Sequence, residues 1–216
     1  MKIMLIAPYV NLNVDRNVNR EDFYPSAALL HLAAVLRAND FEPIIVDLNN
    51  SVVHNQKGKY IDYCKKLIID SLNKNKPDLV GINCLFSGVF PDVLHFAKVI
   101  KSESPLLKIV IGGIHPTSFY QEILANCMDV DYVAIGEGEN TIVELAKAVN
   151  YGDENLLRHI KSFVYRDNDG NIKINKESNF IDDINKLPMP AWDLININDF
   201  EMRLDNYYNP RNLPMK

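Results

Sequence analysis

The sequence predicts an open α/β domain built on a parallel sheet of five strands, in the doubly wound, flavodoxin-like order 2-1-3-4-5. Short runs rich in β-branched residues alternate with longer helical patterns, as in successive βαβ units. The first run, residues 2–7, is apolar without alternation, which is typical of a strand covered on both faces. The 216 residues, 47% of them apolar, suffice for one such domain and a smaller appendage.

The first strand, 2–7, precedes a polar loop and a helix over 25–38, where Pro25 suits the first turn and Asn39-Asp40 the end. The second strand follows at 43–48. An amphipathic helix over 60–73 stops before Pro77. The third strand, 78–84, leads to a helix over 91–102.

The fourth strand, 108–111, ends in Gly112-Gly113, and a helix over 118–126 leads to the fifth strand, 131–135. The last helix, 140–150, is preceded by Gly136-Glu137-Gly138-Glu139, whose acidic residues suit a helix N-terminus. These elements complete one doubly wound unit over residues 1–150.

After residue 150 the pattern changes. Segments 163–166 and 171–174 flank Asp167-Asn168-Asp169-Gly170, a turn sequence that predicts a small β-hairpin. The proline-punctuated stretch 187–200 is expected to be a connector that lies on a surface. Residues 206–216 carry no periodic pattern and are expected to be disordered or a truncated lead-in. We therefore divide the chain into an α/β domain, 1–150, and a hairpin and linker, 151–216.

Composition excludes several classes of function. The net charge of −5 argues against a nucleic-acid partner, which requires a basic face. Cys64, Cys84 and Cys127 match neither a disulfide framework nor a CxxC metal site, so buried thiols are expected. No apolar run approaches the length of a membrane span, and the N-terminal apolar run is too short for a signal peptide. We expect a cytoplasmic protein.

Ligands of open parallel sheets lie outside the carboxyl ends of the strands, near the point where the strand order reverses. The loops at 8–25, 83–88, 112–117 and 136–139 are therefore the candidate site. A phospho-receiver needs paired acids after the first strand, an Asp after the third and a Lys after the fifth. This sequence has Ala7-Pro8, Asn83 and Gly136 in those places. A flavodoxin-type phosphate loop is absent, as are GxGxxG after the first strand and GxxxxGK[ST]. The usual phosphate-binding functions are excluded.

The glycine pair Gly112-Gly113 is the most informative feature of these loops. Without a Cβ, the backbone at a strand's carboxyl end can approach a flat or bulky ligand closely. A purely structural turn is the alternative interpretation. The same two interpretations apply to residues 136–139.

Four segments together resemble one known family. The first comprises residues 24–26, the helix that follows them and residues 45–47, and the second comprises residues 81–83 and Ser87. The third and fourth are residues 111–117 and 131–139. They are similar to the cobalamin-binding domain at the front of cobalamin-dependent radical S-adenosylmethionine enzymes. Leu187-Pro188-Met189-Pro190-Ala191-Trp192 resembles that family's connector into its next domain. In the wider cobalamin-binding group, Ser-x-Leu after the third strand precedes a Gly-Gly. Asn83-Cys84-Leu85 stands in that first place, with Asn for Ser, ahead of Gly112-Gly113.

The resemblance implies a module that binds cobalamin and orients it for methyl or radical transfer, without catalysing alone. The nucleotide tail would thread between the strand ends under Gly112-Gly113 and Ser87-Gly88, and the corrin would lie on loops 8–24 and 136–139. Gly112→Val or Gly113→Val is expected to block the tail while the protein stays folded. The implied cofactor-binding residues are Pro8, Tyr9, Tyr24, Pro25, Asn83, Leu85, Ser87, Gly88, Gly112, Gly113, His115, Pro116, Thr117, Gly136, Glu137, Gly138 and Glu139.

The resemblance also implies how cobalt is held. The wider group's Asp-x-His-x-x-Gly motif, whose His ligates cobalt, has no counterpart, and its His would fall near Pro25. Cobalamin is therefore expected base-off, with no protein ligand to the metal. His115 is expected to pack or hydrogen-bond, because a lone His without convergent ligands rarely binds a metal.

The family's CxxxCxxC, which holds a four-iron cluster, is missing from these residues. S-adenosylmethionine and the cluster would belong to an absent radical S-adenosylmethionine domain, a partner in cis or in trans. The alternative is a non-catalytic sensor or interaction domain that keeps the fold and no longer binds cobalamin. A weaker third interpretation is an unrelated transferase of the same architecture.

Overall fold

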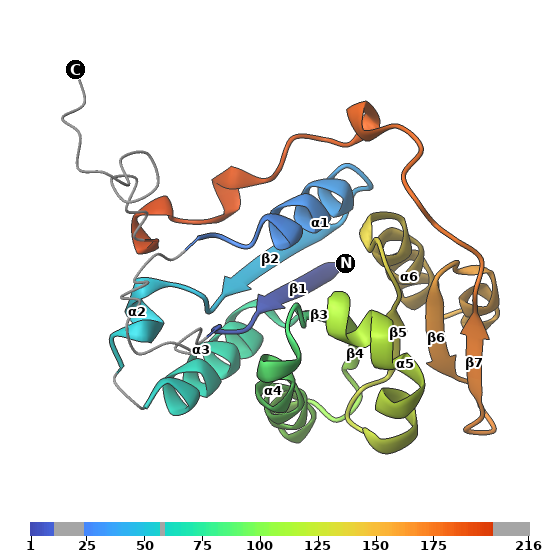
Figure 1. Ribbon diagram of the computed structural model, residues 1–216, viewed down its shortest axis with the longest axis horizontal. Helices are drawn as coiled ribbons and strands as arrows, with labels where there is room; N and C mark the ends of the chain where they lie inside the picture. Colours follow the sequence, from blue (N-terminus) through green and yellow to red (C-terminus); the bar gives the residue numbers. More distant parts are fainter. Residues whose placement is uncertain (11–23, 57–58, 201–216) are drawn as a thin grey trace, which may run out of the picture.

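A computed structural model describes residues 1–10, 24–56 and 59–200. Its centre is a seven-stranded sheet in the order β2-β1-β3-β4-β5-β6-β7 (Figure 1). The first five strands run parallel to one another. The mostly parallel α/β class predicted from the sequence is confirmed. The five strands are β1 (Lys2–Ala7), β2 (Glu42–Asp47), β3 (Leu79–Asn83), β4 (Lys108–Gly112) and β5 (Tyr132–Ala134).

The hairpin does not stand apart from this sheet. Strands β6 (Phe163–Arg166) and β7 (Ile172–Asn175) extend it antiparallel beyond β5, with Val133 opposite Val164. The prediction of a five-stranded sheet with a separate hairpin is therefore wrong. The physical reason is burial on both faces: Phe163 and Val164 point to opposite sides of the sheet and both are fully buried.

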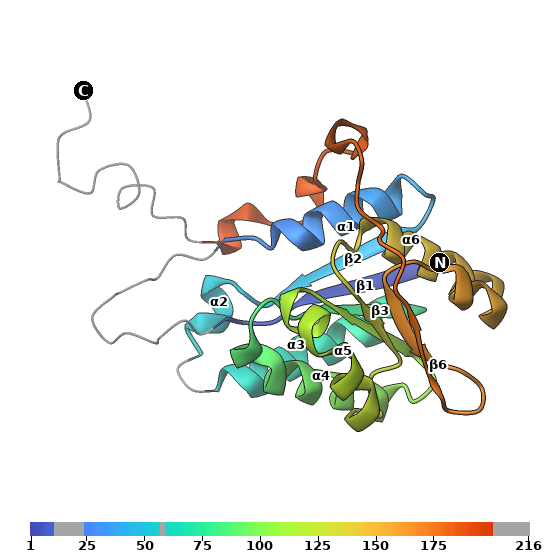
Figure 2. The ribbon, with the colours of Figure 1, turned by 45° about the vertical axis from the view of Figure 1, so that its right-hand side comes forward.

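Two helical layers cover the sheet (Figure 2). Helices α1 (Ala27–Arg37) and α6 (Glu139–Tyr151) lie on one face. Helices α3 (Tyr60–Asn75), α4 (Phe90–Glu103) and α5 (Ile114–Asn126) lie on the other. Each face therefore has its own apolar core, as a doubly wound sheet requires.

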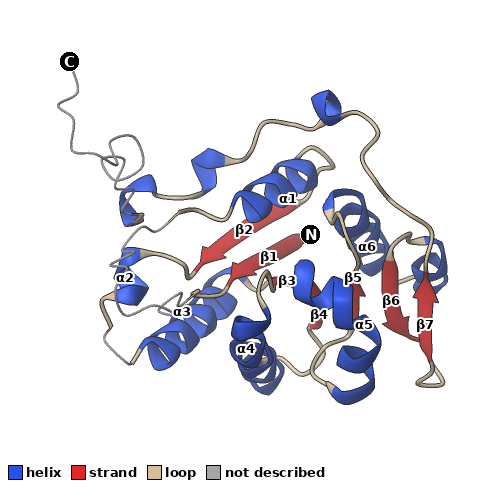
Figure 3. Cartoon of the chain, in the orientation of Figure 1, coloured by secondary structure: helices blue, strands red, loops and turns tan. Residues whose placement is uncertain are grey.

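Several short helical elements lie between the main helices and strands and along the segment after β7 (Figure 3). After β7 the connector, which in the structure comprises residues 176–200, passes back over α1, where the Ala191 N–H donates to the carbonyl of Leu30 (3.1 Å). The short elements are helix α2 (Ser51–His54) and the 3₁₀ turns Ser87–Val89, Glu154–His159, Ile184–Lys186, Trp192–Leu194 and Ile197–Asp199.

Two of the predicted helices begin two or more residues away from the expected position. Helix α1 begins at Ala27, and Ser26 caps it by accepting from the N–H of Leu29. Helix α5 begins at Ile114, four residues before the expected position 118, because the chain turns at Gly113, whose φ is +114°. His115, Pro116 and Thr117 therefore lie in the first turn of a helix and not in a loop.

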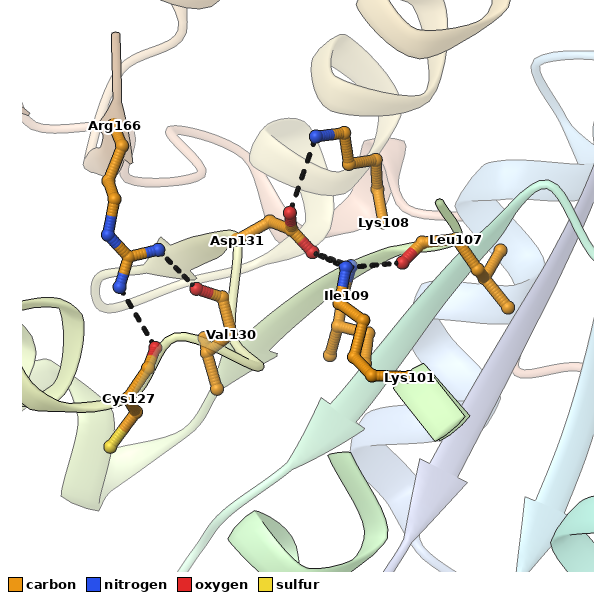
Figure 4. Close-up of polar contacts among 8 residues, drawn as sticks. All are labelled: Lys101, Leu107, Lys108, Ile109, Cys127, Val130, Asp131 and Arg166. Atoms are coloured by element: carbon orange, nitrogen blue, oxygen red, sulfur yellow. Dashed lines mark hydrogen bonds and ion pairs between the residues drawn. The ribbon is translucent and has the colours of Figure 1, made fainter. Parts of the chain in front are cut away.

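The amino edge of the sheet is fastened by a charged cluster around Asp131 (Figure 4). The Asp131 carboxylate accepts from Lys101 Nζ (2.7 Å), from Lys108 Nζ (3.3 Å) and from the N–H of Ile109 (2.8 Å). Arg166, on β6, donates to the carbonyls at the end of α5 and the following turn, those of Leu124, Cys127 and Val130. These contacts tie α4, α5 and the hairpin to the strands they flank.

Candidate functional site

A slot opens between the sheet and the helices α1 and α6. Alternation along the strands places Leu5, Gly81, Val110, Gly112 and Ala134 on this one face of the sheet. Together with the helices above them they enclose a cavity of about 210 Å³ that is open to solvent at the carboxyl ends of the strands. The slot therefore lies at the edge where open parallel sheets bind their ligands.

The floor of the slot exists because side chains are missing there. A Cβ built on Gly81 would lie 3.0 Å from Leu5 Cδ2 and 3.8 Å from Val110 Cγ1. A Cβ on Gly112 would lie 3.6 Å from the Cβ of Ala134. Larger residues at these two positions would fill the space that the glycines leave open.

The two helices supply the opposite wall with aliphatic side chains. Helix α1 contributes Leu29 and Leu32, and α6 contributes Ile142 and Leu145. Gly138, where α6 begins, lies beside α1: a Cβ there would be in ordinary contact with Leu32 Cδ2, at 3.4 Å. The interior is thus an apolar space between two layers that are packed normally elsewhere.

The rim of the slot is shaped by Gly113. Its φ of +114° is a conformation that other residues rarely adopt, and its Cβ would lie 2.6 Å from the carbonyl oxygen of Cys84 and 2.8 Å from Asn83 Oδ1. Gly113 is therefore required by the backbone itself. Gly113→Val is expected to disturb the fold, contrary to the expectation from the sequence, whereas Gly112 has the room that such a test needs.

Thr117 joins the two glycine loops of the rim. Its hydroxyl donates to the carbonyl of Gly113 (2.8 Å) and accepts from the N–H of Gly136 (2.9 Å). One side chain thus fixes the loop after β4 against the loop after β5, and both loops border the slot.

The acidic residues of the rim are held from outside the slot. Glu137 Oε2 accepts from the N–H of Ile181, in the connector, at 2.7 Å. Glu139 stands in the first turn of α6, where a carboxylate suits the helix dipole. The connector therefore contacts the same loop that borders the slot.

His115 lies beside the slot and not in its wall. Its Nδ1 is 2.9 Å from Ser87 Oγ, and its ring packs between Phe90 and Phe119, with centroids 4.3 Å and 4.8 Å away. Burial lowers the pKa of the imidazole. The packing and hydrogen-bonding role expected from the sequence agrees with this environment.

The carboxyl edge around the slot is unusually apolar for a surface. Four large side chains there are between 40% and 63% exposed, and they follow β3 or belong to the start of α5: Leu85, Phe86, Ile114 and Phe119. Exposed apolar groups gathered at one edge are typical of a surface that binds a ligand or a partner.

The structure brings together only part of the residue set predicted from the sequence. The predicted residues that border the slot are Asn83, Gly112, Gly113, Gly136, Glu137, Gly138 and Glu139. Leu85, Ser87, Gly88, His115, Pro116 and Thr117 lie beside it, after β3 and in the first turn of α5. Residues 11–23 of the expected corrin-bearing loop lie outside the described residues.

The predicted residues near the start of the chain lie away from the slot. Pro8 and Tyr9 are buried, and the Tyr9 ring packs on Tyr60, at the start of α3, with centroids 5.1 Å apart. Tyr24 and Pro25 precede α1, and the Tyr24 carbonyl accepts from Asn49 Nδ2. Tyr9 thus belongs to the core on the other face of the sheet, Tyr24 and Pro25 lie just before α1, and none of these residues lines the slot.

Sequence reasoning missed most of the slot's interior. Leu5, Leu29, Leu32, Val110, Ala134, Thr141, Ile142 and Leu145 line it and were not expected there. An available signal was Gly81, which interrupts an apolar strand where a glycine has no turn to make. Its meaning depends on Gly112 and Ala134 facing the same side, which only the strand register reveals.

Asp47, at the end of β2, organises the start of α1. Its carboxylate accepts from the N–H groups of Ser26 (2.7 Å) and Asn49 (2.9 Å). Burial raises the pKa of this carboxyl to about 6, although both hydrogen bonds act in the opposite direction. Asp47 is thus a positioning group for the helix that forms one wall of the slot.

Neither a metal centre nor a membrane segment is found in the part of the chain that the structure describes. Within it, His, Cys, Asp and Glu side chains form no group of three that could hold a metal ion. Every described helix falls short of the length and hydropathy needed to cross a bilayer. Cys64 and Cys84 are buried free thiols, and burial raises the pKa of each to about 12.

A parallel sheet that opens at its carboxyl edge into an apolar slot with a glycine floor defines a cofactor-binding module. The chain belongs to the B12 binding domain family, whose family model matches residues 15–146.

Three curated proteins are similar to this chain over most of its length. The chain is 28% identical over 201 residues to an uncharacterized methyltransferase of Pyrococcus horikoshii, covering 93% of this chain and 40% of that protein. It is 25% identical over 177 residues to an anaerobic magnesium-protoporphyrin IX monomethyl ester cyclase of Rubrivivax gelatinosus, covering 80% of this chain and 29% of that protein. It is 25% identical over 230 residues to a cytidylyl-2-hydroxyethylphosphonate methyltransferase of Streptomyces wedmorensis, covering 92% of this chain and 42% of that protein. The chain thus spans less than half the length of these relatives.

The fold is also similar to that of a solved enzyme. The cobalamin-dependent S-adenosylmethionine radical enzyme OxsB, with aqua-cobalamin and S-adenosylmethionine bound, superposes with a TM-score of 0.68 at 18% identity. The match covers 89% of this chain and 24% of OxsB. At this identity the likeness shows a shared fold.

Proposed function

We propose that this chain is the cobalamin-binding module of a larger cobalamin-dependent radical S-adenosylmethionine enzyme, one that transfers a methyl group or a radical. The observation that carries the proposal is the slot, whose floor of Gly81, Gly112 and Ala134 leaves room for a flat group between the sheet and α1. Membership of the B12 binding domain family supports the same cofactor.

The slot fits the nucleotide tail of cobalamin in size and chemistry. An apolar protein cavity of about 150 Å³ accommodates benzene. The slot measures about 210 Å³ and is open at one end, so it has room for a bicyclic aromatic base. In this proposal the base lies in the slot with its ribose and phosphate toward the rim at Gly112 and Gly136.

The corrin is proposed to lie on loops 8–24 and 136–139, as expected from the sequence, and to extend over the apolar carboxyl edge at Leu85, Phe86 and Ile114. These side chains are 40% to 63% exposed, and the corrin periphery offers apolar surface that could cover them. Cobalamin supplies the cobalt chemistry of group transfer when it is bound, and this chain's residues bind and orient it.

The proposal includes a base-off cofactor without a protein ligand to cobalt. No histidine lines the slot among the described residues. His115 lies beside it, with Nδ1 within hydrogen-bond distance of Ser87 and Nε2 buried and without a hydrogen-bond partner. A tail that occupies the slot cannot at the same time place its base on cobalt. The lower face of cobalt is therefore left to water or to no ligand.

We further propose that residues 1–150, continued by the hairpin, form the module, and that the connector leads to a radical S-adenosylmethionine domain in cis or meets one in trans. Four large apolar side chains of the connector are between 50% and 82% exposed: Phe180, Ile184, Met189 and Trp192. Such a row is typical of a surface that another domain covers. S-adenosylmethionine and the four-iron cluster would be held by that domain.

Titration with hydroxocobalamin, followed by reduction to the Co(II) form and electron paramagnetic resonance, tests this function. We expect stoichiometric binding, a base-off spectrum without nitrogen superhyperfine splitting, and the same spectrum in His115→Ala. Nitrogen splitting lost in His115→Ala would contradict the ligand-free cobalt. No binding at all would favour the alternative of a sensor or interaction domain that has lost the cofactor.

A further inference from the structure

The interior of the slot offers aliphatic surface and almost no hydrogen-bonding groups. The strand backbone at its floor is already paired, since Gly81 lies in register between Leu5 on β1 and Val110 on β4. The side chains that reach the interior from above are those of Leu29, Leu32, Ile142 and Leu145.

The polar residues that line the slot are either engaged or at its rim. Buried Thr141 donates its hydroxyl to the carbonyl of Lys161 (3.3 Å) and accepts from Asn179 Nδ2 (3.3 Å), so both of its hydrogen-bonding roles are filled. Asn83 ends β3, and the carboxylates of Glu137 and Glu139 stand at the start of α6. Asn83 faces the slot in register with Gly112, at the open end of the floor, and none of these three residues lies at the inner part of the floor beside Gly81 and Val110.

We infer that the slot selects among natural cobamides by their lower base, favouring a benzimidazole over a purine. This inference rests on the proposed function. A dimethylbenzimidazole base brings two methyl groups and a single unsubstituted ring nitrogen into the slot. Adenine in the same role brings an amino group and three unsubstituted ring nitrogens, which would lose their water without finding partners on the floor.

Binding of three corrinoids tests the selectivity. Dissociation constants are measured by calorimetry for cobalamin, for the adenine-containing cobamide and for cobinamide, which has no nucleotide. We expect cobalamin to bind at least about tenfold more tightly than the adenine cobamide, the discrimination that about one unpaired buried polar group provides. Cobinamide, which places nothing in the slot, is expected to bind more weakly than cobalamin.

The outcomes separate this inference from the function beneath it. Equal affinity for cobalamin and the adenine cobamide, with cobinamide weaker, would overturn the selectivity and leave the cobalamin-binding function standing. Equal affinity for cobalamin and cobinamide would overturn the placement of the base and the selectivity with it. Failure of all three corrinoids to bind would overturn the proposed function itself.

Two isosteric variants test whether the selectivity is caused by the lack of hydrogen-bonding groups on the floor of the slot. Val110→Thr places a hydroxyl on the floor of the slot, whereas Val80→Thr places the same hydroxyl in the core on the other face of the sheet. Val110→Thr is expected to reduce the ratio of the two dissociation constants by about two- to tenfold, the range of one net hydrogen bond. Val80→Thr is expected to leave the ratio unchanged.

Ala134→Ser, at the half-buried end of the floor, serves if Val110→Thr fails to fold, as judged by its thermal melt. A reduced ratio in a folded floor variant and an unchanged ratio in Val80→Thr support the inference. The same ratio in wild type and in both floor variants would overturn it.

Discussion

Gly113 illustrates how one residue can be fixed by the backbone before any ligand is considered. Its positive φ and the approach of the Cys84 carbonyl to within 2.6 Å of an added Cβ both exclude a side chain. Gly152 has a positive φ of +64° at the end of α6, but it has open space around it. A comparison of alanine substitutions at these two glycines therefore separates the cost of backbone strain from the cost of steric overlap.

We predict that Gly113→Ala lowers the free energy of unfolding by about 3 kcal/mol or more, because overlap adds to strain. Gly152→Ala should cost about 1 kcal/mol, since only the left-handed conformation is penalised. Urea denaturation of both variants measures the difference. Equal losses would show that the Cys84 carbonyl moves aside without cost.

Asp47 is predicted to make stability depend on pH. Burial raises the pKa of its carboxyl from 3.8 to about 6, so the folded protein holds this proton more tightly than the unfolded chain does. The stability contributed by protonation is present in acid and is lost as the pH rises from about 4 to about 6. Relative to Asp47→Asn, wild type should lose up to about 3 kcal/mol across this window, at about 1.4 kcal/mol per pKa unit.

Chemical denaturation of wild type and Asp47→Asn at several pH values between 4 and 7 checks this prediction. A stability difference that stays constant over the whole range would mean that Asp47 titrates normally. A difference that changes in the opposite direction would mean that its hydrogen bonds outweigh its burial.

At the scale of elements, the Asp131 cluster connects α4, β4 and β5. Lys101 and Asp131 are only 14% and 16% exposed, so their ion pair is largely removed from water. By contrast, Lys161 and Glu177 form an ion pair whose side chains are 49% and 76% exposed. The two pairs differ mainly in how much solvent screens them.

Asp131→Asn is predicted to lower the free energy of unfolding by about 2–3 kcal/mol, because it leaves Lys101 partly buried without a counter-charge. This is less than for a fully buried pair, since the amide oxygen introduced by the substitution could still accept from the N–H of Ile109. The matched change Glu177→Gln should cost less than about 1 kcal/mol. Thermal melts of the two variants compare them, and similar losses would contradict the account.

The elements show what sequence can and cannot reveal. The apolar runs of β1, β3 and β4 are read directly from the sequence, because these strands are covered on both faces, whereas the edge strand β2 is only partly buried. The early start of α5 was missed because helical geometry begins at once after the positive φ of Gly113, which no periodicity records. The hairpin was recognised from its turn, but its pairing partner was not, because that pairing depends on which strand edge remains free.

The slot itself could be anticipated only in part. The rim glycines Gly112, Gly113, Gly136 and Gly138 are visible in the sequence, and they border the slot. The interior residues come from β1, β3, β4, β5, α1 and α6, and each looks like an ordinary core residue on its own. Their convergence is a property of register and layer packing, which single-sequence patterns do not contain.

At the scale of the whole molecule, the hairpin belongs to the folded unit. Phe163 and Val164 are fully buried, one in each core, and β6 covers the edge of β5. We predict that a fragment of residues 1–150 loses several kcal/mol of stability, since each such buried side chain contributes about 1.5–3 kcal/mol, and that it aggregates through the bared edge.

A fragment of residues 1–200 is the matched control, since it keeps both hairpin strands and the connector. It should remain monomeric in size-exclusion chromatography and unfold in one cooperative transition. The same behaviour from residues 1–150 would show that the hairpin is dispensable.

The central claim is that the nucleotide tail of cobalamin occupies the slot floored by Gly81 and Gly112. The most direct measurement is the ratio of the dissociation constants of cobinamide and cobalamin for wild type, Gly112→Ala and Gly112→Val, with thermal melts to verify folding. We predict that wild type prefers cobalamin, that Gly112→Ala weakens this preference, and that Gly112→Val abolishes it, because the larger side chain fills the space beside Ala134. An undiminished preference for cobalamin in a folded Gly112→Val protein would contradict it.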